Sequence, residues 1–190
     1  MSNPFSFIQK SQFNGQIEQE VIASGYSSEF GKLVAAQANL ESGGYSNVAF
    51  TQYNNPFGYK YNSSKYQSGQ GNAANDGGYY AAYATIEDAV DELIAWFERR
   101  QANGDFNISD IHTPKDYVNA LIADPTYYWF SNGNSRPTQS QINDYIYGMS
   151  NLSQKIQFLY EENADAVNIG GGLIAIGVLV FIYAKYNKQI

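Results

Sequence analysis

The chain has 190 residues, with 44% hydrophobic and 15% charged residues, and it carries a net charge of −7 at pH 7. This length suffices for one domain with a hydrophobic core, and the acidic balance argues against a nucleic-acid partner, which needs a basic surface. Cysteine is absent and histidine occurs once, at His112, so disulfides are excluded and zinc sites are not favoured. We therefore expect no metal and no cofactor.

The first third of the chain predicts two helices. Residues 1–16 lack a basic start followed by an apolar run, so we expect no secretory signal. Residues 15–24 are typical of a short helix. A second helix, capped by Ser28, is predicted through about Glu41, because apolar residues recur at three- and four-residue steps: Phe30, Leu33, Val34, Ala36 and Leu40.

The middle of the chain changes character. Residues 61–82 are rich in Asn, Ser, Gln, Gly and Tyr without any periodicity, which indicates a loop or a small β-hairpin. Thr85 and Asp88 predict a capping box at the start of an amphipathic helix that ends at Asn103-Gly104. Another helix is expected from Thr113-Pro114 to about Asp124, with proline at its first position.

The C-terminal part contains a long predicted helix and an apolar run. The helix is expected from about Thr138 to Asn163, either docked on the domain or paired with a second copy. From Ala166 to Ala184 there is no charge, and Ile169–Ala184 is almost wholly apolar. At about 1.5 Å per residue the uncharged stretch from Ala166 to Ala184 is roughly 28 Å long, which is typical of a transmembrane helix; a buried hairpin or an oligomer-core helix is the alternative.

The predicted transmembrane helix raises the question of how the N-terminal domain reaches the other side of the membrane. Lys185 and Lys188 follow the run and favour a cytoplasmic C-terminal tail, which places the large N-terminal domain on the other side of the membrane. No export signal is expected to carry it there. Delivery by a virus particle that contains a membrane would remove this conflict.

Glu41 is the candidate acid. Cleavage of a glycosidic bond needs one carboxylic acid to protonate the leaving oxygen, and a second group that stabilises the cation-like centre or activates water. At a helix C-terminus on the border of the core, burial and the helix dipole disfavour ionisation, so we expect a protonated Glu41 near neutral pH. A solvated glutamate at a helix end is the alternative.

Two segments resemble the paired motif of bacterial and phage peptidoglycan glucosaminidase domains. Residues 37–43 read Gln-Ala-Asn-Leu-Glu-Ser-Gly, and residues 54–60 read Asn-Asn-Pro-Phe-Gly-Tyr-Lys. Residues 83–85 and 123–127 resemble later segments of the family, in the same order. The resemblance covers residues 28–130 and implies a mostly α (α+β, lysozyme-like) fold, with a helical catalytic domain and a small β-hairpin or loop lobe.

The resemblance implies an enzyme that cuts the glycan strands of peptidoglycan. Glu41 would be its general acid and Tyr127 would lie near the cleft. The substrate-binding residues would be Ser42, Asn54, Asn55, Phe57, Tyr59 and Tyr83. Asn54 and Asn55 could instead form a turn, and the tyrosines of this region could stack on sugars or simply pack: Tyr59, Tyr61, Tyr66, Tyr79 and Tyr80.

The chain departs from the family at three positions. The family's Trp after Glu-Ser-Gly is Gly44, and its Leu is Pro56. The family's second acidic candidate lies in the β-lobe, where Asp76 is the only carboxylate of residues 61–82. Asp76 is therefore the candidate second catalytic group. Without it, the acetamido group of the substrate could assist.

Other functions stay open. Glu41-Ser42-Gly43-Gly44 also resembles the signature of lytic transglycosylases, which need one glutamate. A non-catalytic protein that binds the cell wall or fills a capsid vertex is a further alternative, as is a tail-anchored host enzyme in the bacterial envelope. The expected organisation is a catalytic domain over 1–137, a helical stalk over 138–165 and a transmembrane helix over 166–186. Partners would be glycan strands, a lipid bilayer contacted through Ile169–Ala184, and either a second copy or capsid and vertex proteins.

Overall fold

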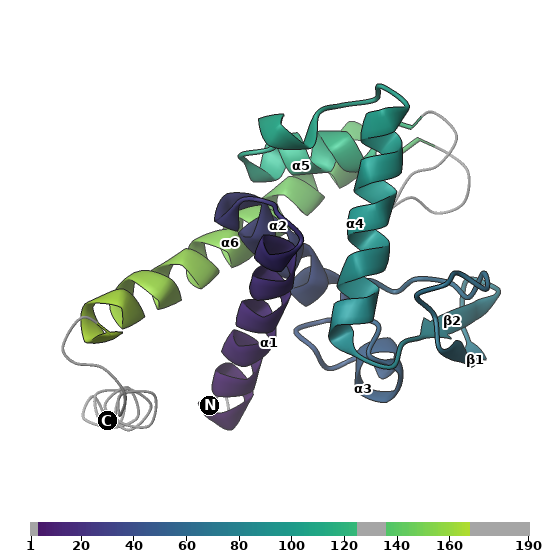
Figure 1. Cartoon of the computed structure of the whole chain (residues 1–190), viewed down its shortest axis with the longest axis horizontal. Coiled ribbons are helices and arrows are strands. Elements are labelled where there is room, and N and C mark those ends of the chain that lie inside the picture. Colours follow the sequence, from purple (N-terminus) through teal and green to yellow (C-terminus); the bar gives the residue numbers. More distant parts are fainter. Residues whose placement is uncertain (1–3, 125–135, 168–190) are drawn as a thin grey trace.

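The computed structural model describes the backbone of residues 4–124 and 136–167, and the side chains of residues 9–124 and 136–153. The described chain is mostly helical with one small antiparallel sheet of two strands, which confirms the predicted mostly α class with a β-hairpin (Figure 1). The elements in chain order are α1 (Pro4–Ala23), α2 (Ser28–Glu41), α3 (Val48–Tyr53), β1 (Gly69–Ala73), β2 (Tyr79–Ala82), α4 (Ile86–Ala102), the 3-10 turn η1 (Ile108–Asp110), α5 (Pro114–Leu121) and α6 (Gln139–Val167).

The first two helices pack side by side. α1 begins at Pro4, well before the predicted start at residue 15, and it buries Ile17 and Val21 against its neighbours. The N-cap of α2 is Ser27 rather than the predicted Ser28: its hydroxyl accepts a hydrogen bond from the Phe30 backbone N–H at 3.1 Å. Ser28 instead donates to the buried Glu18 carboxylate of α1 at 2.7 Å, which ties α1 to the start of α2.

The core lies where α2, α4 and α5 meet. Phe30, Phe97 and Tyr117 are each at most 2% exposed, and their ring centroids lie 5.1 to 5.8 Å apart. Burying three aromatic side chains in mutual contact stabilises the fold by several kcal/mol in total, on the order of 2 kcal/mol each. This cluster fixes α2, the helix that carries Glu41, against the later helices.

Two of the predicted helix starts are confirmed in detail. Thr85 and Asp88 form a capping box at α4, and Thr113 and Asp116 form another at α5, with Pro114 in the first turn. In each box the threonine hydroxyl accepts a hydrogen bond from the backbone N–H three residues on, while the aspartate accepts one from the threonine N–H. α4 ends at Ala102, just before the predicted Asn103-Gly104 stop.

The sequence alone does not decide whether residues 61–82 form a loop or a small β-hairpin. The structure has a hairpin in this region, which we call the hairpin lobe. β1 pairs with β2, and a short extended segment pairs with the other edge of β2 through Lys60 and Tyr80. Because Tyr61 donates its backbone N–H to the Tyr79 carbonyl at 2.8 Å, these two tyrosines lie opposite each other. Tyr61 is 37% exposed and Tyr79 is 49% exposed, so the pair presents aromatic surface to solvent.

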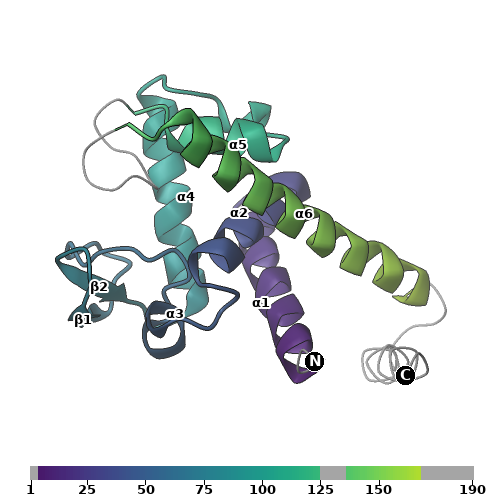
Figure 2. The same cartoon turned by 180° about the vertical axis from the view of Figure 1, so that it is seen from behind.

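The long C-terminal helix docks on the body, which is one of the two arrangements that the sequence left open. The first half of α6 packs against α2 and α5 and buries Ile142 and Met149 in the common core. Its second half extends away from the other helices (Figure 1, Figure 2). The side chain of Tyr145 reaches α2 from the docked half.

The predicted transmembrane helix over 166–186 lies almost entirely outside the described residues. Within the described ranges, no helix combines the length and the apolar character needed to cross a bilayer. The membrane span therefore stays a prediction from the sequence.

Candidate functional site

Glu41 lies at the last residue of α2, where α6 crosses it. The Tyr145 hydroxyl of α6 donates a hydrogen bond to the Glu41 carboxylate at 2.5 Å, across 104 residues of sequence. Glu41 is partly exposed as a residue, and its carboxyl is oriented by the Tyr145 hydroxyl. An oriented carboxyl on a residue that is not fully buried is compatible with a general acid.

A second polar pair lies one helical turn before Glu41. Gln37 is fully buried, and its side-chain oxygen accepts a hydrogen bond from the Tyr117 hydroxyl of α5 at 2.6 Å. Gln37 and Glu41 are four residues apart on one helix, so they lie on the same face of α2. Three helices therefore supply this polar cluster, which we call the Glu41 cluster: Gln37 and Glu41 from α2, Tyr117 from α5 and Tyr145 from α6.

The two phenols of the Glu41 cluster remain protonated at all physiological pH values. Burial first, and then the nearby charge of Glu41, raise the pKa of Tyr117 and that of Tyr145 well above the ordinary value of a phenol. Both hydroxyls therefore act as hydrogen-bond donors toward α2. The Gln37 Nε2 group, which is also buried, has no hydrogen-bond partner among the residues whose side chains are described.

The turn after Glu41 is built by the motif residues themselves. Ser42 is fully buried, and its hydroxyl accepts a hydrogen bond from the Tyr45 backbone N–H at 2.7 Å. Asn47 caps α3 with its side-chain oxygen, and its Nδ2 donates to the Glu41 carbonyl at 3.0 Å. Ser42, an expected substrate-binding residue, thus holds the turn, and none of its described contacts faces a ligand.

Gly44 stands where the family that the motif resembles has Trp, and its surroundings do not favour a large side chain. Its φ is +73°, in the left-handed region that favours glycine, and an added Cβ would lie 2.5 Å from the Lys10 Nζ of α1. Lys10 occupies the space beside the turn that a larger side chain would need. A tryptophan at this position would require both a strained backbone and displacement of the lysine.

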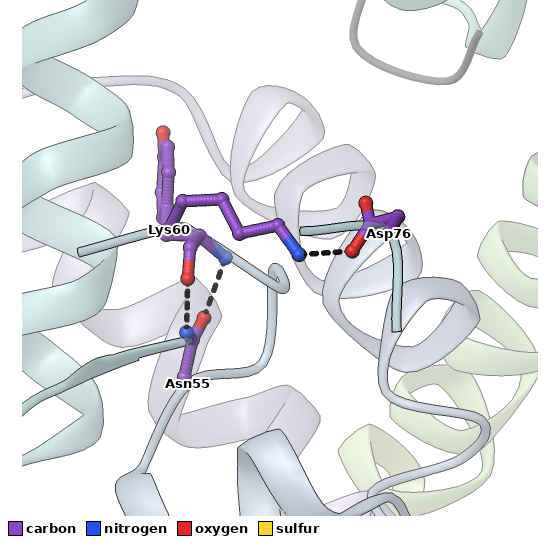
Figure 3. Close-up of polar contacts among 4 residues, drawn as sticks. Asn55, Lys60 and Asp76 are labelled. Atoms are coloured by element: carbon purple, nitrogen blue, oxygen red, sulfur yellow. Dashed lines mark hydrogen bonds and ion pairs between the residues drawn. The ribbon is translucent and has the colours of Figure 1, made fainter. Parts of the chain in front are cut away.

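The two asparagines of the second motif are engaged with backbone groups. Asn54 adopts the left-handed conformation at φ +51°, and its Nδ2 donates to the carbonyls of Tyr83 and Ala84 at 3.2 and 3.1 Å. Asn55 is fully buried and exchanges two hydrogen bonds with the Tyr59 backbone, at 2.9 and 3.0 Å (Figure 3). This is the turn-forming role that the sequence gave as the alternative to sugar binding.

Three other expected substrate-binding residues contribute to packing. Phe57 is buried in the core, and Tyr59 is partly buried against it, with ring centroids 6.1 Å apart. Tyr83 is 3% exposed and donates its hydroxyl to the Glu92 carboxylate at 2.6 Å. Burial and this contact raise the pKa of the Tyr83 hydroxyl far above its ordinary value.

Asp76 lies at the tip of the hairpin lobe, in the turn between β1 and β2. Its carboxylate forms an ion pair with Lys60 (Figure 3). The hydrogen bond from Lys60 lowers the pKa of Asp76, so this group is ionised at neutral pH. The structure thus joins Asp76 to Lys60 and Glu41 to Tyr145, in separate contacts. The remaining expected catalytic residue, Tyr127, lies outside the described residues.

Glu92 is a buried carboxylate that the sequence analysis did not single out. It is 5% exposed on α4 and accepts hydrogen bonds from Tyr83 and from the Gln67 side chain, the latter at 3.1 and 3.2 Å. These contacts fasten the hairpin lobe to α4. The available signal was its position between the apolar residues Val90, Leu93 and Ile94, which form the inward face of the helix. Among the described side chains, no group of three or more Asp, Glu or His is placed to hold a metal ion.

Comparison with known proteins gives no relatives for this fold and site. No family model, no curated protein and no solved structure matches the chain. The resemblance to peptidoglycan glucosaminidase domains therefore remains a prediction that rests on the motif residues themselves.

Proposed function

We propose that this protein is a membrane-anchored glycosidase of the glucosaminidase type, with a lysozyme-like fold, that cleaves the glycan strands of peptidoglycan. One observation carries the proposal: Glu41 is a partly exposed residue at the end of a packed helix, and its carboxyl is oriented by a phenol from a distant helix. The motif around Glu41 and the mostly helical body with a hairpin lobe agree with it.

The proposed reaction begins with Glu41 as general acid. Its proton goes to the glycosidic oxygen while the bond from that oxygen to the anomeric carbon breaks, and the bonding electrons stay with the oxygen. Water then adds to the anomeric carbon and loses a proton. Either Asp76 or the acetamido group of the substrate would assist this second half.

The exposed tyrosines of the hairpin lobe support a carbohydrate substrate. Tyr61 and Tyr79 lie opposite each other on adjacent extended segments and are both open to solvent. Aromatic faces of this kind pack against the apolar faces of sugar rings while their hydroxyls stay hydrogen-bonded. The lobe would thus hold the glycan strand, and Glu41 would act on it.

A second candidate reaction uses Glu41 alone. A lytic transglycosylase needs one glutamate, which first donates and then accepts a proton, and the 6-hydroxyl of the substrate replaces water as the nucleophile. The ion pair between Asp76 and Lys60 favours this reaction. Asp76 is the only carboxylate of residues 61–82, and the ion pair engages it with the lysine. The alternative that is not an enzyme is a non-catalytic protein that binds the cell wall or fills a capsid vertex.

Mass spectrometry of fragments released from purified peptidoglycan separates these candidates. The full chain in detergent is compared with Glu41→Gln and with Glu29→Gln, an exposed glutamate at the start of the same helix. We expect reducing N-acetylglucosamine ends from the wild type and from Glu29→Gln, and a loss of at least about 100-fold for Glu41→Gln. Anhydro-muramyl ends would identify a lytic transglycosylase. If the folded protein releases no fragments, the non-catalytic wall-binding or vertex protein is favoured instead.

The proposed location is the internal membrane or a vertex of a bacteriophage particle, where the enzyme would open the cell wall during entry. The support is the apolar run Ile169–Ala184 together with the motif around Glu41. Fractionation of purified particles and of uninfected cells tests this. Detection in the envelope of uninfected cells, and not in particles, would instead favour a tail-anchored host enzyme.

A further inference from the structure

The Glu41 cluster contains a hydroxyl that the proposed reaction does not yet use. Tyr145 belongs to α6, outside the segment that resembles the family, and its hydroxyl lies 2.5 Å from the Glu41 carboxylate. A glutamate at a helix end has three rotatable side-chain bonds, and the hydrogen bond from Tyr145 restricts the direction of its carboxylate. A phenol that donates to a carboxylate forms a charge-assisted hydrogen bond, which is short and directional.

We propose that Tyr145 is a positioning residue for Glu41, and that the close crossing of α2 and α6 at Gly148 sets the geometry of their hydrogen bond. This inference rests on the proposed function for its effect on the reaction. The positioning itself concerns only contacts within this chain.

The crossing of the two helices is tight at Gly148. A Cβ added there would lie 3.2 Å from Leu40 Cδ1 and 3.4 Å from Leu40 Cδ2, so the Leu40 side chain, or the helix that carries it, would have to move by a few tenths of an ångström. Leu40 directly precedes Glu41, and Gly148 follows Tyr145 by three residues on the same face of α6. A change in the crossing distance is therefore passed directly to the distance between Tyr145 and Glu41.

The titratable and charged groups around Glu41 determine how its pKa responds to a substitution. Tyr145 faces it from α6 and Tyr117 faces it from α5, and both phenols stay protonated over the working range. From α1, the Lys10 ammonium lies over the Gly44 turn, three residues after Glu41. Since the phenols do not ionise, removal of one hydroxyl changes hydrogen bonding to Glu41 without changing the charge of the site.

Two tyrosines of α6 provide a matched pair of variants. Tyr145→Phe removes the hydroxyl that donates to Glu41, whereas Tyr147→Phe removes a hydroxyl from a side chain that is 70% exposed on the same helix. We expect Tyr145→Phe to lower kcat about tenfold with little change in KM, while Tyr147→Phe leaves kcat near the wild-type value. Gly148→Ala should fall between wild type and Tyr145→Phe.

The decisive readout is the titration of Glu41 itself, followed by carbon-13 NMR of glutamate-labelled full chain in detergent, with Glu41→Gln identifying the resonance. A carboxylate that loses a donated hydrogen bond is protonated more easily, so we expect the Glu41 midpoint to move up by about one pH unit in Tyr145→Phe and not in Tyr147→Phe. Because Glu41 acts in its protonated form as the general acid, the alkaline limb of the pH–rate profile should move with it.

The outcomes separate the two proposals. An unchanged Glu41 titration in folded Tyr145→Phe overturns the positioning role, whatever the activity. A shifted titration in a protein that releases no fragments from peptidoglycan supports the positioning role and overturns the proposed function. A shifted titration together with a lower kcat supports both.

Discussion

Asn55 illustrates how a motif residue can be essential to the fold. Its fully buried amide makes three hydrogen bonds, two of them to the carbonyls of Tyr59 and Ala81 and one from the Tyr59 N–H. The same side chain thereby ties the segment after α3 to β2. In a motif that resembles an enzyme's, such a residue supports the site without having to touch a substrate.

Removal of this amide should therefore destabilise the protein. Asn55→Ala leaves buried backbone groups without partners, at a cost of about 3 kcal/mol in the free energy of unfolding, measured by urea denaturation. Asn72→Ala, at an exposed position of the same hairpin, is the control and should change stability by at most about 0.5 kcal/mol. Equal effects of the two changes would contradict the role assigned to Asn55.

At the scale of an element, α5 depends on its capping box. The Asp116 carboxylate accepts a hydrogen bond from the Thr113 hydroxyl at 2.7 Å and another from the Thr113 N–H at 2.9 Å. The contact with the Thr113 hydroxyl is the main cause that lowers the pKa of Asp116 below its ordinary value. α5 matters to the site because it carries Tyr117 of the Glu41 cluster.

The sign of the pH dependence follows from this shift. Because the pKa of Asp116 is lower in the folded than in the unfolded state, its contribution to stability is present above about pH 4 and is lost as pH falls through the folded value. Asp116→Asn should cost about 0.5 kcal/mol at pH 7, since solvent screens this site, and progressively less as the pH falls through the folded value. Urea denaturation at pH 7 and at successively lower pH measures this, and Asp144→Asn, exposed on α6, is the control.

At the scale of the whole molecule, α6 connects the site to the predicted anchor. It carries Tyr145 against α2 and continues to Val167, a further length of roughly 33 Å at the rise of an α-helix. The apolar run Ile169–Ala184 follows directly in the sequence. One helix thus joins the candidate acid to the segment that we expect in the bilayer.

Vesicle flotation tests the anchor. We expect the full chain to float with lipid vesicles, and Leu179→Arg to reduce the floating fraction, because an arginine in the middle of a span costs about 3 kcal/mol. Asn187→Arg adds the same charge outside the apolar run and should float like the wild type. Wild-type protein that stays in the dense fraction would argue against a membrane span.

The sequence by itself determined the local features of this protein. The start of α4 with its capping box, the start of α5 at Thr113-Pro114 and the end of α2 at Glu41 follow from apolar spacing and from residues that satisfy backbone groups nearby in the chain. The sequence left a loop or a hairpin open over residues 61–82, and the capping box of Thr113 and Asp116 was not predicted. The six-residue α3 was missed because it is too short for a helical repeat, and the early start of α1 was missed because residues 4–14 show no regular apolar spacing.

Only the tertiary structure decided how the site is assembled. Tyr145 lies 104 residues from Glu41 and Tyr117 lies 80 residues from Gln37, and no periodicity within a helix encodes a contact between helices. The same holds for Glu92, whose burial comes from the Tyr83 and Gln67 side chains that the lobe brings to α4. Local hydrogen bonding and apolar spacing set the elements, whereas side-chain packing between distant elements determines which polar groups meet.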